Sequence, residues 1–351
     1  MIDICVFAGR MRPFTDAHLY NIRQGLASAQ YVVVLVGSTN EPINFRNPFT
    51  FPEVREMIRA SLTPQEADRV FIFGIEDQDT DPKWVIEVQR QINALIKRLS
   101  FGHEPTVSLI GHSKDDSSYY LEMFPQWGAI NTENFGDNLS ATDVRETLYL
   151  AAFHDQELAD MTLPRGTALF LREWVDTPAF AEMREEFFAD RNERRKFQPH
   201  PYNDWHWHEC ADAVAIQSGA VLLVKRGFAP GKGLWALPGG HRQLERFRET
   251  ALRELCEETG LDEFNPHLSK EVLRTLIWGE KLCDDPWRST RMVTTSVAYG
   301  FRIPGTTRPI VKGQDDAAEA RWWNLDEVTR EMMFEDHFVI LRHFADRFDT
   351  F

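Results

Sequence analysis

The sequence predicts two α/β domains: a doubly wound domain with a parallel sheet over residues 1–198, and a second domain over residues 199–351. Short apolar runs alternate with amphipathic stretches along the first half, as expected where helices join the strands of a parallel sheet. The chain of 351 residues is longer than one hydrophobic core usually serves. Prolines also interrupt it near residue 200, which favours a boundary there.

The first domain begins with a strand–helix–strand unit. Residues Ile2–Phe7 form a short apolar run, His18–Ala29 is amphipathic at helical spacing, and Tyr31–Val36 is continuously apolar, as in a buried parallel strand. Such a unit is expected to have a right-handed crossover. The alternation continues with a helix near Pro52–Ala60, a strand at Val70–Phe73, a helix at Lys83–Leu99 and a strand at Val107–Ile110. This order predicts a Rossmann-like sheet.

The domain boundary is placed at the segment Gln198–Pro201. A charged helix over Phe180–Phe197 should end before its prolines. Beyond it, strands are expected at Ala213–Ile216, Val221–Val224, Arg274–Trp278 and Thr294–Phe301, with a closing helix from Asp326.

Composition narrows the class of protein. The formal net charge of −15 argues against a nucleic-acid-binding or anionic-membrane surface. Four scattered cysteines, with no Cys-x-x-Cys pair, favour a reducing compartment. Neither a signal peptide nor an apolar run of spanning length is evident. We therefore expect a soluble cytoplasmic protein, which is free to form a homo-oligomer.

An acidic helix closes the most informative stretch of the chain. Between Glu245 and Gly260 the pattern predicts a helix that ends at a C-terminal glycine, with Glu254, Glu257 and Glu258 on one face. Acidic side chains in the last turn oppose the helix dipole by roughly 0.3–1 kcal/mol each. An acidic face exposed to solvent would gain no stability from this placement, whereas a bound divalent cation would turn the unfavourable interaction into a favourable one. The pattern predicts a metal site.

The segment Gly239-x5-Glu245-x7-Arg253-Glu254-(apolar)-x-Glu257-Glu258-x-Gly260 resembles the box of Nudix hydrolases. The resemblance implies an α/β/α sandwich with a mixed sheet, which splits nucleoside diphosphates linked to another group. It implies Glu254, Glu257 and Glu258 as ligands of Mg²⁺ (or Mn²⁺), with Glu245, Arg253 and Glu258 taking part in catalysis. Gly239 and Gly240 would contact the substrate. Further candidates for the general base are Asp315, Asp316 and Glu319.

The first domain carries two phosphate-binding candidates. The loop Gly9–His18 brings His18 to the start of a helix, where an anion is favoured. The segment Ser140-Ala141-Thr142-Asp143-Val144-Arg145 places a cation near another helix start, where it is unfavourable unless a phosphate binds. Ser140 and Asp143 could also form only a capping box.

Together these segments resemble nucleotidyltransferases. The segments between them, Arg46–Thr50, Asp77–Trp84 and Gly111–Asp115, are similar to archaeal-type nicotinamide mononucleotide (NMN) adenylyltransferases, which in some bacteria are fused to a Nudix domain. The resemblance implies that His18 and Arg145 stabilise the ATP phosphates, that Arg46 meets a phosphate and that Trp84 stacks on the nicotinamide ring. It assigns further catalytic or substrate contacts to Thr15, Gly9, Arg10, Lys114, Ser140 and Thr142.

The nucleotidyltransferase pattern reads His/Thr-x-Gly-His, and two positions depart from its usual form in the NMN enzymes. Thr15 stands where the NMN enzymes usually have histidine, and Ala17 stands where glycine is usual.

We expect a bifunctional enzyme that makes NAD⁺ and pyrophosphate from NMN and ATP and hydrolyses ADP-ribose to AMP and ribose 5-phosphate. The alternative is a Nudix hydrolase alone, regulated by a degenerate nucleotide-binding domain. In either case the partners are small nucleotides such as ATP, NMN, NAD and ADP-ribose.

Overall fold

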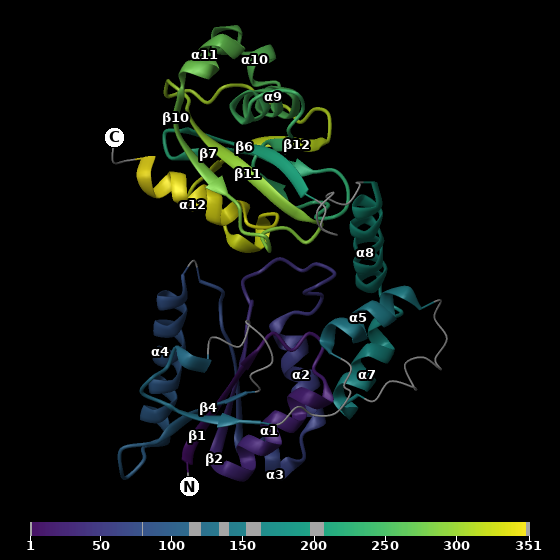
Figure 1. Ribbon diagram of the computed structural model, residues 1–351, viewed down its shortest axis with the longest axis vertical. Helices are drawn as coiled ribbons and strands as arrows, with labels where there is room; N and C mark the ends of the chain where they lie inside the picture. The colour runs from purple at the N-terminus through teal and green to yellow at the C-terminus, as the bar shows by residue number, and fades with distance from the viewer. Residues whose placement is uncertain are drawn as a thin grey trace. The chain divides into compact units, whose positions relative to one another are not determined.

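A computed structural model describes residues 2–78, 80–111, 121–132, 140–151, 163–196 and 207–348. Its internal contacts divide the chain into two compact units, Met1–Arg184 and Glu185–Phe351, so the division falls inside the helix α8 (Pro178–Lys196) (Figure 1). The boundary expected from the sequence, between residues 198 and 199, lies outside the described residues and stays a prediction.

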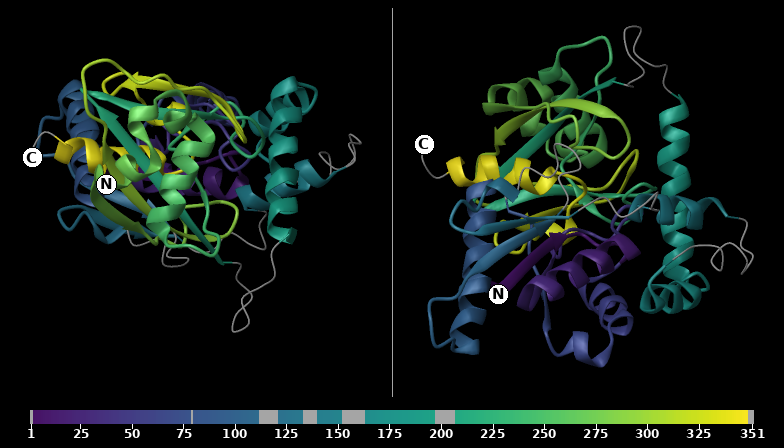
Figure 2. Two further views of the ribbon diagram at one scale, coloured as in Figure 1. Left: turned by 90° about the horizontal axis from the view of Figure 1, so that it is seen from above. Right: turned by 60° about the horizontal axis from the view of Figure 1, so that its bottom comes forward.

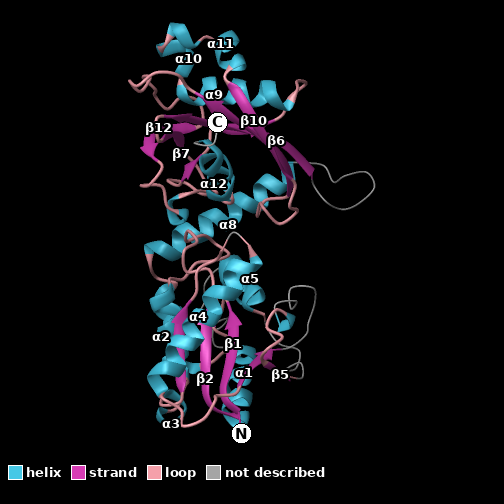
Figure 3. Cartoon of the chain, turned by 90° about the vertical axis from the view of Figure 1, so that its left-hand side faces the viewer, coloured by secondary structure: helices cyan, strands magenta, loops and turns pink. Residues whose placement is uncertain are grey.

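The first unit is built on a five-stranded sheet in the order β3-β2-β1-β4-β5, in which every pair is parallel (Figure 3). Its elements before α8 are β1 (Ile2–Gly9), α1 (Asp16–Ser28), β2 (Ala29–Val36), α2 (Phe51–Ser61), α3 (Pro64–Ala67), β3 (Val70–Gly74), α4 (Asp81–Leu99), β4 (Val107–Gly111), β5 (Gly128–Asn131), α5 (Ala141–Leu150) and α7 (Arg165–Trp174). The predicted strands and helices are present, each within a few residues of its expected ends.

Helices cover both faces of this sheet because side chains of successive strand residues point in opposite directions. Val6 and Val33 pack with Val88 and Ile92 of α4 on one face. On the other face, Gly25 of α1 approaches the sheet closely. Figure 1 shows α4 on one side of the strands and α1 and α2 on the other. The doubly wound prediction is confirmed.

The second unit contains a mixed seven-stranded sheet. The main order is β10-β11-β6-β7-β12; β8 pairs with β7 and β9 with β6, and only β11 and β6 run parallel. Its elements after α8 are β6 (Trp207–Gln217), β7 (Ala220–Arg226), β8 (Trp235–Ala236), β9 (Gly239–His241), α9 (Phe247–Thr259), α10 (Leu261–Phe264), a 3₁₀ turn (Pro266–Leu268), α11 (Lys270–Thr275), β10 (Ile277–Cys283), β11 (Val293–Arg302), β12 (Ala317–Asn324), a second 3₁₀ turn (Arg330–Met332) and α12 (His337–Phe348).

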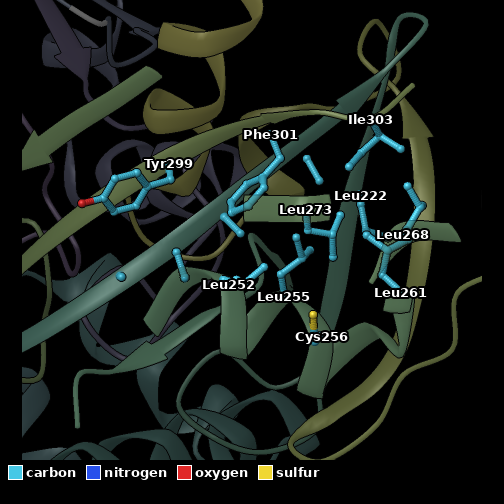
Figure 4. Close-up of a cluster of buried hydrophobic side chains, with 14 of the residues drawn as sticks. Leu222, Leu252, Leu255, Cys256, Leu261, Leu268, Leu273, Tyr299, Phe301 and Ile303 are labelled. Atoms are coloured by element: carbon cyan, nitrogen blue, oxygen red, sulfur yellow. The ribbon is translucent and has the colours of Figure 1, made fainter. Parts of the chain in front are cut away.

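Two apolar clusters cover the faces of this sheet. On one face, Leu252 and Leu255 of α9 pack against Leu222 and Phe301 (Figure 4). On the other, a cluster joins the sheet residues to Ile340, Leu341 and Phe344 of α12. Figure 2 shows the strands of this unit from two further directions. The α/β/α sandwich expected from the Nudix resemblance is confirmed.

Two predicted elements of the second unit are wrong in part. Arg274 belongs to α11 rather than to a strand, because Leu273 is buried under α9 and Arg274 pairs with Glu249. The closing helix begins at His337, not near Asp326. Shortly before this helix the chain is extended, because Met333 forms a β-bridge with Trp235 and the Phe334 amide donates to the Trp235 carbonyl at 2.8 Å.

Within the described ranges, none of the helices combines the length and the hydropathy that crossing a bilayer requires.

Two candidate active sites

The acidic helix of the second unit is α9. It begins at Phe247, so Glu245 lies in the loop before it, and it ends at Gly260 in the left-handed conformation with φ of 60°. Glu257 and Glu258 lie in its last turn, as the spacing predicted. Glycine suits this end because a Cβ at Gly260 would lie 2.4 Å from the Phe264 ring.

Arg253 holds three of the predicted acids around one guanidinium group. Its Nε donates to Glu245 at 3.0 Å, and its Nη1 donates to Glu254 at 2.7 Å and to Glu257 at 3.0 Å. Its Nη2 reaches the His241 carbonyl at 3.1 Å. Burial alone would lower the pKa of Arg253, but the hydrogen bonds that it donates to Glu257 and Glu245 and the charge of Glu254 raise it. Arg253 therefore remains charged and orders the carboxylates.

Glu258 occupies a different environment from its neighbours. It is buried, and its Oε2 accepts a hydrogen bond from the Gly239 amide at 3.0 Å. Burial raises the pKa of Glu258 to about 8, with Glu254 and Asp316 adding repulsion and the Gly239 amide opposing it. Burial likewise raises the pKa of Glu254. The fold thus concentrates negative charge that Arg253 only partly neutralises.

The two glycines of β9 let these acids approach the main chain. A Cβ at Gly240 would lie 2.4 Å from Oε1 of Glu254, and one at Gly239 would lie 2.4 Å from Oδ1 of Asp212. Any side chain at either position would displace a carboxylate. Asp212, which is buried and strand-borne, was missed from the sequence because no motif marks it.

A cavity of about 600 Å³ opens beside the acidic helix. It is lined by Gly239, Gly240, Arg253 and the three α9 glutamates, together with Asp315 and Asp316. Glu319, the third candidate for the general base, is exposed and lies outside this lining. Besides Arg253, the cavity is lined by four cations that no sequence motif marks, namely Lys225, Arg226, Arg288 and Arg291.

Arg226 has no carboxylate within ion-pair distance among the described residues. Its guanidinium lies 4.0 Å from the ring centroid of Phe334, and its Nε donates to the Pro230 carbonyl at 2.9 Å. Arg288 and Arg291 pair instead with acids, Asp336 at 2.8 Å and Glu193 at 3.3 Å. The cavity therefore offers positive charge beside its acids.

The donor set fits a hard divalent cation. Carboxylate oxygens are the ligands that magnesium and manganese accept. A bound cation would also favour the charged forms of Glu254 and Glu258, whose pKa values are raised. In the part of the chain that the structure describes, however, no three acidic, histidine or cysteine side chains converge as a preformed metal site. Glu254 and Glu257 are directed to Arg253 instead. Their role as ligands stays a prediction.

In the first unit, His18 is positioned by the start of α1. Thr15 caps this helix, and its backbone N–H donates to Nδ1 of His18 at 3.0 Å. The Phe14 ring stacks on the imidazole, with centroids 5.8 Å apart. Burial lowers the pKa of His18 to about 4. Since Nδ1 accepts, the neutral ring carries its proton on Nε2 and acts as a donor rather than as a cation.

Arg145 lies in the first turns of α5. Its Nη1 donates to the Arg12 carbonyl, and its Nη2 donates to the Thr142 hydroxyl at 3.1 Å. Burial lowers the pKa of Arg145 to about 10, and the charges of Arg10 and Arg46 act in the same direction. Ser140 forms the capping box, because its amide and hydroxyl donate to Asp143 at 2.8 Å and 2.7 Å.

A cavity of about 320 Å³ lies at the carboxyl ends of the strands β1 to β3. Gly9, Arg10 and Trp84 line it, together with Ser38 and Asp77. Arg46 is exposed in the loop before α2, with its guanidinium 5.6 Å from the centroid of the Phe45 ring. Lys114 lies outside the described residues. The structure thus brings three of the predicted contacts to one cavity and links Arg10, Arg46 and Arg145 electrostatically.

Comparisons with known proteins match both units. Residues 6–147 match the family described as cytidylyltransferase-like, and residues 206–344 match the NUDIX domain. The chain is 34% identical over 187 residues to a nicotinamide/nicotinic acid mononucleotide adenylyltransferase of Acinetobacter baylyi, covering 53% of this chain and 94% of that protein. It is 29% identical over 136 residues to an ADP-ribose pyrophosphatase of Methanocaldococcus jannaschii, covering 38% of this chain and 71% of that protein.

Solved structures also match nearly the full length of the chain. One of them is a bifunctional NMN adenylyltransferase/ADP-ribose pyrophosphatase from Francisella tularensis, complexed with AMP and a manganese ion. It is 30% identical, with a TM-score of 0.85 and 99% of each chain covered. The chain therefore belongs to the family of bifunctional NMN adenylyltransferase/ADP-ribose pyrophosphatases.

Proposed function

We propose that this chain synthesises NAD⁺ from NMN and ATP in its first unit and hydrolyses ADP-ribose in its second. One observation carries the proposal: both sites occur in a single chain that aligns over 99% of its length with the Francisella bifunctional enzyme. The alternative of a hydrolase with a degenerate first domain is not favoured, because that unit keeps its sheet, its cavity and the Arg145 contacts.

The first reaction needs no protein nucleophile. A phosphate oxygen of NMN attacks the α-phosphorus of ATP in line, and the bond from that phosphorus to the bridging oxygen breaks to release pyrophosphate. Arg145 would neutralise charge that develops on the leaving group, and Nε2–H of His18 would donate to it. Arg10 and Trp84 would hold the substrates in the cavity that they line. Thr15 would contribute by orienting His18, because its backbone N–H donates to Nδ1 of that histidine.

In the second reaction a water adds to one phosphorus of the pyrophosphate, and the bridging bond breaks to give AMP and ribose 5-phosphate. We propose Mg²⁺ as the natural ion at Glu254, Glu257 and Glu258, with Mn²⁺ able to replace it. When bound, such an ion polarises the phosphate and lowers the pKa of a coordinated water. Arg253 holds Glu245, Glu254 and Glu257 in order, and Asp315 and Asp316 remain candidates for the proton acceptor.

Two assays on one preparation test this proposal. Protein with Mg²⁺, ATP and NMN should produce NAD⁺ and pyrophosphate, followed by chromatography. Protein with Mg²⁺ and ADP-ribose should produce AMP. Absence of NAD⁺ would refute the first half of the proposal, and intact ADP-ribose would refute the second.

We also propose small nucleotides as the partners of this chain, a choice that its net charge of −15 supports over nucleic acid. Homo-oligomer formation and a cytoplasmic location stay predictions from the sequence.

A further inference from the structure

Arg12 is a buried cation that the predicted sites did not include. It is 2% exposed, and its guanidinium donates to three main-chain carbonyls. Nε reaches Phe49 at 2.8 Å, Nη1 reaches Gly37 at 2.7 Å and Nη2 reaches Ser38 at 3.3 Å. One side chain therefore ties the loop after β1 to the loop between β2 and α2 at two separate places.

The loops that Arg12 joins both contain a non-glycine residue in the left-handed region. Met11, which precedes Arg12, has φ of 54°, and Ser38, which accepts its Nη2, has φ of 57°. Residues other than glycine seldom adopt this conformation, and they keep it where surrounding contacts enforce it, often at ligand sites. Gly37 and Ser38 line the cavity that also contains Gly9 and Arg10. The hydrogen bonds of Arg12 therefore fix the loop residues that form the wall of that cavity.

The main chain of Arg12 makes a third connection. Its carbonyl accepts the hydrogen bond from Nη1 of Arg145, whose Nη2 is directed to Thr142. Arg12 thus joins both loops to the residue expected to bind the ATP phosphates. A change in the position of Arg12 would move Arg145 and the cavity wall together.

The charge of Arg12 is not explained by packing alone. No carboxylate of the described residues lies within ion-pair distance of it. Burial lowers its pKa to about 10, and Arg10 and Arg145 add repulsion while Asp77 opposes it. Positive charge that no described carboxylate pairs with directly is suited to a polyphosphate.

We propose that Arg12 is a positioning residue for NAD⁺ synthesis: its three carbonyl bonds set the spacing between the cavity wall and Arg145. This inference rests on the proposed function of the first unit. It concerns a residue that acts through Arg145 and the two loops, without a contact to the substrate.

The chain contains a matched control, Arg69. Its guanidinium also donates to three main-chain carbonyls, those of Gln30 at 2.9 Å, Leu26 at 2.7 Å and Ala29 at 2.6 Å. These carbonyls lie where α1 ends and β2 begins, at the other end of the strand from Gly37. Arg69→Met removes the same kind of hydrogen bonds without altering residues that line the cavity.

The experiment measures kcat and KM of NAD⁺ synthesis for Arg12→Met, Arg12→Lys, Arg69→Met, Arg145→Ala and the double variant Arg12→Met/Arg145→Ala. Hydrolysis of ADP-ribose by the same preparations reports on the second unit, and circular dichroism with thermal unfolding reports on whether the first unit is folded. We expect Arg12→Met to lower kcat/KM for ATP about 10- to 100-fold in the parent, but only about 2-fold when Arg145→Ala is already present. Arg12→Lys should lose nearly as much as Arg12→Met, because an ammonium cannot span three carbonyls. Arg69→Met should keep parental synthesis.

Equal fold losses from Arg12→Met in both backgrounds would overturn the proposal, as would parental synthesis by Arg12→Lys. Should circular dichroism show that Arg12→Met is misfolded, Arg12→Lys alone decides. Absence of NAD⁺ from the parent chain itself would instead refute the proposed function of the first unit.

Discussion

In the first unit, burial lowers the pKa of Arg12 and of Arg145, the positive charge of Arg10 lowers both further, and neither Arg12 nor Arg145 forms an ion pair with a described carboxylate. In the second unit, the acids of α9 surround Arg253, and burial raises the pKa of Glu254 and of Glu258. Each site therefore holds an excess of one sign of charge. The first is suited to phosphates that the substrates bring, and the second to a cation that must come from solution.

The two sites also differ in how far each of them can be predicted from local sequence spacing. The acids of the second site lie three and four residues apart on one helix, so their shared face follows from helical geometry. The cations of the first site come from the loop after β1, the loop before α2 and the start of α5. Only the packing of the sheet brings these segments together.

The largest expected effect tests the excess of negative charge. Glu257→Gln should lower ADP-ribose hydrolysis about 10³-fold, because it removes one oxygen charge from the proposed metal site, while NAD⁺ synthesis is unchanged. Steady-state assays of both reactions check this. Glu249→Gln is the control on the same helix, since Glu249 pairs with Arg274 and does not line the cavity. Parental hydrolysis by Glu257→Gln would contradict the metal-binding role.

The next effect tests the excess of positive charge. Arg145→Ala should lower NAD⁺ synthesis about 10²-fold, because the leaving phosphates lose a charged donor, and should leave hydrolysis unaffected. Arg145→Lys should recover part of this loss, since it keeps the charge but loses the two-pronged geometry. Arg172→Ala, at an exposed position of α7, is the control. If Arg145→Ala lowers both reactions equally, the loss reflects folding rather than phosphate binding.

A smaller effect tests the close approach of glycine to the acids. Gly240→Ala should lower hydrolysis roughly 10-fold, because its Cβ would lie 2.4 Å from Oε1 of Glu254 and displace that carboxylate. Gly102→Ala is the control, as no heavy atom lies within 4 Å of a Cβ at that position. Hydrolysis at the parental rate by Gly240→Ala would show that the position of Glu254 is not critical.

Sequence spacing predicted the alternating strands and helices from β1 to β4, the strands β6, β7 and β11, and the closure of α9 at Gly260, because these depend on residues near one another in the chain. It failed at Arg274 and in the residues before His337, where contacts with α9 and β8 outweigh local preference. Local preference is a weak guide where tertiary contacts form.

The candidate sites show the same division. The resemblance to the Nudix box implied a catalytic part for Arg253, and the structure places this residue among three of the acids. The sequence could not choose among Asp315, Asp316 and Glu319, because the turn before β12 decides which of them reach the cavity. Arg12 and Arg226 lie in no recognisable motif, and their significance depends on the carbonyls and rings around them.

The smallest expected effect concerns proton binding by His18. Burial lowers its pKa from 6.5 to about 4, so the unfolded chain binds a proton more readily than the folded chain between these values. The contribution of His18 to the free energy of unfolding is therefore complete above pH 6.5 and is lost as the pH falls toward 4. Urea unfolding at pH 7.5 and 5.5 checks this: the parent should lose more stability on acidification than His18→Gln does, whereas exposed His267→Gln should behave like the parent. Equal losses in the parent and His18→Gln would mean that the pKa of His18 is the same in the folded and the unfolded chain, so that its ring would gain a proton as the pH falls rather than remain a neutral donor.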